Sequence, residues 1–158
     1  MECPSVPVFL NASGIFDVEF RIIVGCRDGT LYTFKRGFSK PKVAIPLTSQ
    51  IVGIEKSGKN VIVGCMNKNL YCYTTKGKKI WKLEMPSNIL CMGDLELKDK
   101  GIQGVIVSLA NNEIIIYRDK FIISRFSTQD AVIGMNFGRF GREDSNLIMT
   151  TKSNLINI

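Results

Sequence analysis

A pattern of about twelve residues that recurs along the whole chain is the feature that most constrains its fold. Each copy is a run of β-branched and apolar residues, a short polar turn and a second such run. The copies end at Phe34, Tyr73, Tyr117 and Ile158, so the spacings are 39, 44 and 41 residues. Each copy predicts a β-hairpin, and a repeat of this length is typical of β-propeller blades.

Every hairpin has further strand-like segments beside it. An apolar run precedes each one, and a more alternating run follows the first three, at residues 42–47, 79–85 and 121–126. No stretch longer than ten residues shows a convincing helical period. We therefore expect an all-β chain, a single partial β-propeller domain spanning residues 1–158. Its blades of four antiparallel strands are expected at roughly 6–47, 51–85, 89–126 and 131–158.

The fourth repeat stops after its third strand, at Ile158. A propeller protects its strand edges by closing into a ring. Closure with four blades is rare, and the outer strand of the last repeat is missing. We therefore predict about four consecutive blades of a larger ring rather than a closed four-bladed one.

The net positive charge of the chain does not by itself identify a class of partner. It carries 21 Lys and Arg against 14 Asp and Glu, a formal net charge of +7. The basic residues are spread along the sequence, without the clustered aromatics or recognised module of a nucleic-acid-binding protein. We expect solvated loops and no nucleic acid, with an acidic partner or an anionic membrane surface as minor alternatives. No apolar run is long enough to span a membrane, and no signal peptide is recognisable at the start.

The residue types needed for most enzyme chemistry are missing. Histidine is absent, and the five cysteines form no CxxC pair, so we expect no metal, no cofactor and no catalytic site. The cysteines are expected to be reduced, mostly buried thiols of a cytosolic protein. Residues 53–60 nearly match a P-loop, but Asn60 follows Lys59 where Ser or Thr is needed, and a strand follows instead of a helix. We expect residues 57–60 to form a turn.

The best candidates for binding a partner lie in the last repeat. The stretch 138–144 combines glycines with charged residues of both signs, in a predicted loop. Two interpretations stay open: an ion-pair network that fixes the turn, or a patch that faces a partner. The candidate partner-binding residues are Arg139, Phe140, Arg142, Glu143, Asp144 and Lys152.

Two large side chains are expected to pack rather than bind. Trp81 alternates with Ile80 and Lys82 on a strand, which favours packing between blades. Met149 lies in an apolar triplet on a presumed inner strand, so we expect burial there and a large loss of stability in Met149→Arg.

Several segments resemble one family. They are Asp17-Val18-Glu19-Phe20-Arg21, Cys26-Arg27-Asp28-Gly29, Lys76-Gly77-Lys78-Lys79-Ile80-Trp81, Ile116-Tyr117-Arg118-Asp119-Lys120, Asp130-Ala131-Val132 and above all the long irregular block 137–151. Together they are similar to the Bardet–Biedl syndrome protein 1 family, in the second half of its N-terminal seven-bladed propeller. The similarity runs from about Val6 to Ile158.

This resemblance implies a subunit of the BBSome, a coat-like complex that carries membrane proteins into and out of cilia. It implies a non-enzymatic scaffold whose propeller is recruited to membrane by a GTP-bound Arf-like GTPase, with residues 131–158 in the docking surface. The implied partners are the other BBSome subunits and ciliary membrane-protein cargo. The implied locations are the cytoplasm, the ciliary base and the ciliary membrane, with membrane association only through the complex.

Two alternatives remain. Residues 70–73 and 76–81 also resemble the repeats of quinoprotein-type propellers, which would make the chain an assembly factor or one of the enzymes that use pyrroloquinoline quinone. The acidic metal cluster of those enzymes is not visible in this sequence. A generic peptide-binding propeller is the other alternative.

Overall fold

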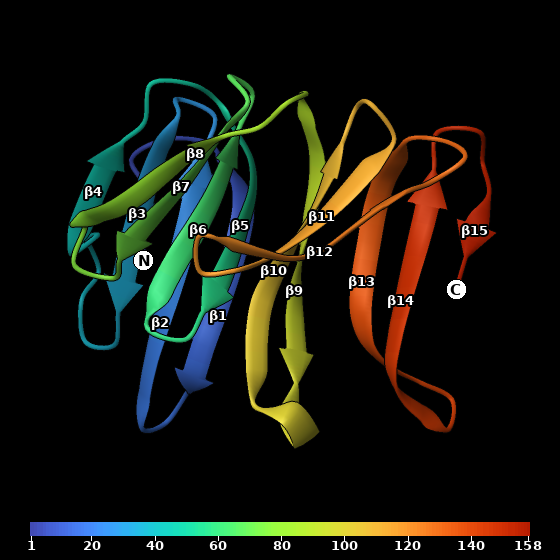
Figure 1. Cartoon of the computed structure of the whole chain (residues 1–158). Helices are drawn as coiled ribbons and strands as arrows, with labels where there is room; N and C mark the ends of the chain where they lie inside the picture. Colours follow the sequence, from blue (N-terminus) through green and yellow to red (C-terminus); the bar gives the residue numbers. More distant parts are fainter.

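The chain folds into four antiparallel sheets that follow one another along the sequence (Figure 1). The computed structural model describes all 158 residues. In each sheet the strands are paired in chain order, so that the first strand is innermost and the last is outermost. We call the sheets blades 1 to 4. This arrangement confirms the predicted β-propeller architecture.

Blades 1 to 3 each have four strands. Their strands are β1 Pro7–Ile15, β2 Glu19–Cys26, β3 Thr30–Lys35 and β4 Val43–Pro46; β5 Ile51–Ser57, β6 Asn60–Cys65, β7 Asn69–Thr74 and β8 Lys79–Glu84; and β9 Ile89–Leu97, β10 Ile102–Leu109, β11 Glu113–Arg118 and β12 Phe121–Ser127. A single 3-10 turn, η1 Lys98–Lys100, joins β9 to β10. As predicted, residues between Ser57 and Asn60 form a turn rather than a phosphate-binding loop.

Blade 4 has three strands, as the truncated fourth repeat predicts. They are β13 Val132–Phe140, β14 Glu143–Thr151 and the short β15 Ile156–Asn157. No strand covers the outer edge of β15, where the other blades have their fourth strand. Ile156 is consequently 70% exposed and Ile158 68% exposed.

Successive side chains of a middle strand point to opposite faces of its sheet and pack against different blades. This explains why such strands are apolar on both faces. Ile62 of β6 packs with Val105 and Tyr117 of blade 3. The next residue, Val63, packs with Ile23 of blade 1. The middle strands of blades 2 and 3 are therefore buried between two other sheets, and a continuous apolar run is the pattern that such a strand requires.

The three largest apolar clusters lie between successive blades, and a smaller fourth cluster lies on blade 1 alone. One cluster joins blades 1 and 2, a second joins blades 2 and 3, and a third joins blades 3 and 4. Trp81 and Leu83 pack against the second cluster, which confirms Trp81 as an inter-blade residue. Met149 packs against the third cluster but is only half-buried, because blade 4 ends the row.

The innermost strands also touch from blade to blade: β1 lies against β5, β5 against β9 and β9 against β13. The close approach explains the glycines of the repeat. A Cβ atom on Gly25 would lie 2.6 Å from Cδ1 of Ile54, and one on Gly64 would lie 2.5 Å from Sδ of Met92. Glycine at these positions lets the next blade pack closely.

The cysteines behave as small apolar side chains. Cys26, Cys65 and Cys72 are buried, and Cys3 and Cys91 are half-buried, all as free thiols. Burial raises the pKa of Cys65 to about 11. Such a thiol stays protonated and poorly nucleophilic at neutral pH.

Candidate partner-binding surface

The candidate residues from the sequence lie mainly on one hairpin. Strands β13 and β14 run on to a tight turn at residues 141–142, where Gly141 has a φ of 61°. The predicted loop is thus a two-stranded extension, in which Phe140 pairs with Glu143. This hairpin brings together five of the six candidates: Arg139, Phe140, Arg142, Glu143 and Asp144.

An ion pair crosses this hairpin. Nε of Arg139 lies 3.5 Å from Oδ1 of Asp144, and the same Nε donates a hydrogen bond to the carbonyl of Gly141. The two side chains of the ion pair are 74% and 76% exposed. An ion pair in this setting contributes little to stability, at most about 1 kcal/mol. The pair can orient Arg139, but it leaves both charges accessible to a partner.

The tip of the hairpin carries side chains without an intramolecular role. Phe140 is 52% exposed, and Arg142 and Glu143 are exposed and form no ion pair. An exposed aromatic ring among unpaired charges is a composition that suits protein contacts, where aromatic residues and arginine are enriched. The hairpin therefore contains an ion pair across its strands and, at its tip, exposed side chains that are free to contact a partner.

A hollow separates the hairpin from blade 3. Its volume is about 590 Å³, and it lies between Arg139 and Asp144 on one side and the η1 turn, Lys98–Lys100, on the other. Charges of both signs line it, including Asp94 and Glu96 of β9. The hollow gives the hairpin a polar, open flank rather than an apolar ligand pocket.

The sixth candidate is not part of this surface. Lys152 follows β14, at the opposite end of that nine-residue strand from the hairpin tip. A strand of this length spans about 30 Å. The turn around Lys152 is held separately: its backbone N–H donates to the carbonyl of Ala131, and that of Ser153 donates to Oδ2 of Asp130 at 2.6 Å. Hydrogen bonding by the Ser153 side chain, and then by its backbone N–H, lowers the pKa of Asp130.

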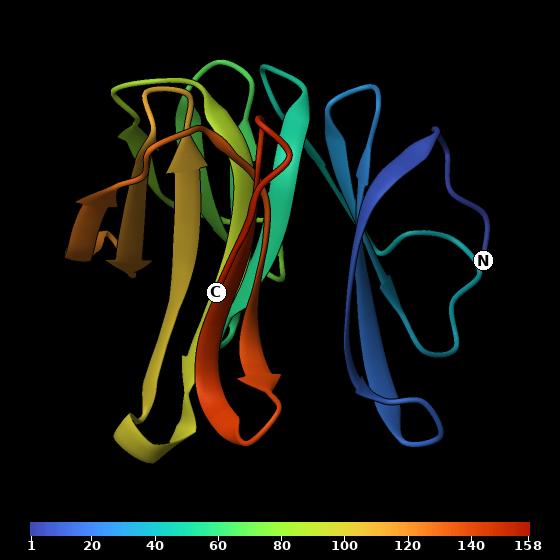
Figure 2. The same ribbon diagram turned by 90° about the vertical axis from the view of Figure 1, so that its right-hand side faces the viewer.

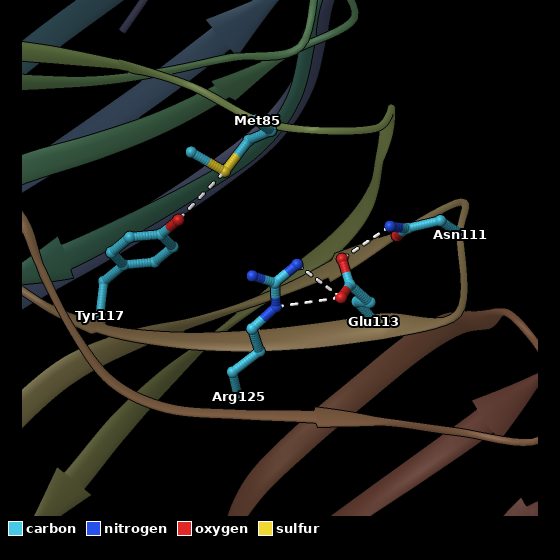
Figure 3. A network of polar contacts seen from close by, with 5 residues as sticks. All are labelled: Met85, Asn111, Glu113, Tyr117 and Arg125. Carbon is cyan, nitrogen blue, oxygen red and sulfur yellow. Dashed lines mark hydrogen bonds and ion pairs between the residues drawn. The ribbon is translucent and has the colours of Figure 1, made fainter.

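A polar network on blade 3 has a structural role that the sequence did not indicate (Figure 3). Glu113 of β11 accepts hydrogen bonds from Asn111, at 2.6 Å, and from Nε of Arg125, at 3.0 Å, on β12. These bonds, first that from Asn111 and then those from Arg125, lower the pKa of Glu113. Nearby, the hydroxyl of Tyr117 donates to Sδ of Met85, which links blade 3 to blade 2. The network braces the outer strand of blade 3.

Two further features bear on possible chemistry. No three His, Cys, Asp or Glu side chains are grouped closely enough to hold a metal ion. No helix in the structure has the length and apolar character needed to cross a membrane.

The fold groups basic side chains that are far apart in the sequence. They are spread along the sequence, but of the thirteen that lie in turns, ten lie at one end of the blades. A signal was available, because in an antiparallel sheet every second turn lies at the same end. Assigning each lysine to its turn would have revealed the grouping.

Comparisons with known proteins agree on one family. A family model described as "Ciliary BBSome complex subunit 1" matches residues 1–35. The BBSome complex member BBS1 of mouse is 47% identical over 152 residues, which is 96% of this chain and 26% of that protein. The human BBSome complex member BBS1 is 48% identical over 152 residues, which is again 96% of this chain and 26% of that protein. The chain thus spans about a quarter of the length of these curated relatives.

Solved structures give the same relationship. The crystal structure of BBS1N in complex with ARL6DN, soaked with mercury, superposes with a TM-score of 0.94 at 35% identity. It matches 99% of this chain and 51% of that one. A computationally designed protein, Ika4, superposes with a TM-score of 0.73 at 15% identity, which shows a shared fold alone. Sequence and fold together show that this chain belongs to the BBS1 family, as a segment of its β-propeller.

Proposed function

We propose that this chain is a non-enzymatic scaffold segment of a BBSome subunit, and that it contributes to docking a GTP-bound Arf-like GTPase. The observation that carries the proposal is the close superposition on BBS1N, with a TM-score of 0.94, in a crystal structure that contains ARL6DN. We further propose that the segment corresponds to the second half of the family's propeller. It would act in the traffic of ciliary membrane proteins, at the ciliary base and membrane.

Within this proposal, the hairpin of β13 and β14 is the docking element. Its tip presents Phe140, Arg142 and Glu143 without intramolecular ion pairs, and Arg139 and Asp144 form only an exposed pair. A rigid two-stranded hairpin loses little conformational entropy on binding, which favours affinity. Lys152 lies at the far end of β14, so a contact at Lys152 would be separate from that of the hairpin tip.

The experiment that tests the proposal is a binding assay with the whole chain. The chain is immobilised and exposed to the Arf-like GTPase loaded with either a non-hydrolysable GTP analogue or GDP. The proposal predicts retention of the GTP form and not of the GDP form. Equal retention of both forms, or of neither, contradicts it.

Matched variants then test the docking element. A hairpin variant carries Phe140→Ser, Arg142→Ala and Glu143→Ala. The control carries Met66→Ser, Asn67→Ala and Lys68→Ala in the exposed turn between β6 and β7. The hairpin variant is expected to lose about tenfold or more in affinity, as for interface anchors, and the control to bind normally. Lys152→Ala, measured alone, reports whether the GTPase also reaches Lys152.

A further inference from the structure

The turns of the propeller fall into two groups by topology. The turn between the first and second strand of a blade and the turn between its third and fourth strand lie at the same end of the sheet. In both views the turns after β1, β9 and β13 lie at the lower edge of the molecule (Figures 1 and 2). We call this end the basic end and define it by the turns at residues 16–18, 36–42, 58–59, 75–78, 98–101, 119–120 and 141–142.

Positive charge is concentrated in these turns. They contain ten basic and three acidic residues, whereas the turns at the opposite end contain three basic and two acidic residues. The turns of the basic end thus carry a net charge of +7, and the turns of the opposite end carry +1. The basic residues of that end are Arg36, Lys40, Lys42, Lys59, Lys76, Lys78, Lys98, Lys100, Lys120 and Arg142.

These ten side chains are all exposed, and none of them forms an ion pair. Arg36 alone has a structural task, because its guanidinium donates to the carbonyl of Val18 and so ties the outer turn of blade 1 to its inner turn. Eight of the ten are lysines. Lysine is a compact, mobile charge without the fork geometry that arginine uses to recognise one particular carboxylate or phosphate.

The basic end is continuous across the four blades. Three hollows run along it, one between each pair of successive blades, and each is lined by turn or strand-end residues of both blades, with acidic as well as basic side chains. The first brings Gly14 of blade 1 together with Lys59 and Thr75 of blade 2. The others bring Lys59 to Lys98, and Lys98 to Arg139. A broad surface made of turn tips results, rather than one deep pocket.

Exposed phenylalanines stand among these lysines. Phe16 is 77% exposed, Phe38 44%, Phe121 65% and Phe140 52%, and each lies in or directly beside a turn of the basic end. Nζ of Lys42 lies 4.1 Å from the ring centre of Phe38, and Nζ of Lys120 lies 5.5 Å from that of Phe121. No exposed aromatic ring lies in the turns of the opposite end.

We propose that the basic end docks on an anionic phospholipid surface. Mobile lysines spread over a broad face match the diffuse negative potential of acidic lipid headgroups. Aromatic rings at the tips of the turns can enter the boundary between headgroups and acyl chains, where amphipathic elements place their apolar residues. Eight of the ten basic residues are lysines, and protein interfaces are enriched in arginine and depleted in lysine. The composition of the basic end therefore favours a lipid surface over an acidic protein.

The test measures co-sedimentation of the whole chain with phosphatidylcholine vesicles that contain or lack phosphatidylserine, with no GTPase present. Its outcome is therefore independent of the proposed GTPase docking. The chain is expected to bind only the vesicles with phosphatidylserine. Raising the salt from about 0.1 M to about 0.5 M NaCl is expected to release it, because exposed charges are then screened.

Two triple variants with the same net charge locate the surface. Lys59→Glu, Lys78→Glu and Lys100→Glu change the basic end, and Arg27→Glu, Lys68→Glu and Lys152→Glu change the opposite end. The first set is expected to weaken vesicle binding by more than about tenfold, and the second by much less. Circular dichroism checks that each triple variant is folded. If one is not, both are replaced by variants in which the same lysines and arginine are changed to glutamine.

A second pair of variants tests the rings. Phe16→Ser with Phe121→Ser removes two rings of the basic end, and Phe126→Ser removes an exposed ring elsewhere on β12. Only the first is expected to reduce binding. The proposal is overturned by absence of binding, by equal weakening in both charge variants, or by insensitivity to the loss of Phe16 and Phe121. Binding to polyglutamate but not to the vesicles overturns it as well.

Discussion

Ser108 of blade 3 donates a hydrogen bond from its Oγ to the backbone carbonyl of Val132 in blade 4, at 2.7 Å. Both residues are buried, at 1% and 0% exposure. In the first two repeats the position of Ser108 is occupied by glycine: Gly25 lies against Ile54 of the next blade, and Gly64 lies against Met92. In the third repeat the hydroxymethyl group reaches the Val132 carbonyl instead and so joins the two blades.

Replacing this serine should therefore loosen the last interface. Ser108→Ala removes the donor and leaves the Val132 carbonyl only the weak contact from Sγ of Cys91, at 3.5 Å. We expect a loss of about 1–2 kcal/mol in the free energy of unfolding, measured by urea denaturation. Ser124→Ala, on the exposed outer strand β12, is the control. An unchanged midpoint for Ser108→Ala would show that the bond contributes nothing.

A side chain at Gly104 would collide with backbone atoms, which cannot move aside as a flexible side chain can. A Cβ atom at this position of β10 would lie 2.4 Å from the carbonyl oxygen of Tyr117 on the paired strand. Gly104→Ala is expected to cost roughly 3 kcal/mol, since the ladder itself must shift. In the control Gly93→Ala, the nearest atom is Cγ of Met135, at 3.1 Å, which can move. Equal thermal midpoints for the two variants would refute this assignment.

Met149 is a sensitive position for charge. It is half-buried on β14, opposite Met135, and packs against the cluster between blades 3 and 4. Met149→Arg is expected to cost about 2–4 kcal/mol, because the guanidinium must leave this interface or remain without a partner. Met66→Arg, at a position 58% exposed, should leave the thermal midpoint nearly unchanged. Similar melting of both variants would show that burial at Met149 is unimportant.

Stability should depend on pH through Glu55. Burial, and to a smaller extent the charge of Asp94, raise the pKa of Glu55 from 4.5 to about 7. The folded chain therefore keeps a proton that the unfolded chain has released, so stability falls as the pH rises between these two values.

Glu55→Gln removes that dependence. We expect little effect near pH 4 and a gain of order 1–2 kcal/mol at about pH 8, measured by urea denaturation at both pH values. Glu84→Gln on the exposed outer strand β8 controls for loss of a negative charge. A gain that is the same at both pH values would contradict the role of Glu55.

The fold was largely predictable because the repeat indicates both the strands and the way in which the blades stack. Ile62 and Val63 are both β-branched, which predicts a strand. Neither is polar, which predicts that both faces of the strand are covered by neighbouring blades. The missing fourth strand of blade 4 was also visible in the sequence. The extent of each strand was not: β13 runs through Gly138, and only residues 141–142 form the turn, because pairing across the hairpin continues to Phe140 and Glu143.

The candidate surface was predicted only in part. Arg139 to Asp144 are close in sequence, so any turn brings them together, and the ion pair between these two residues was one of the expected outcomes. Lys152 was grouped with them by sequence proximity, but the length of β14 separates them. The basic end could not be recognised from runs of charge, since its lysines come from turns scattered over the chain.

Hydrogen exchange on the chain with and without the Arf-like GTPase tests the central claim most directly, because it reports both binding and location. In the presence of the GTP form we predict slower exchange at residues 139–144 of the β13–β14 hairpin, and no change with the GDP form. Unchanged exchange throughout the chain with the GTP form, or protection confined to blades 1 and 2, would contradict the account.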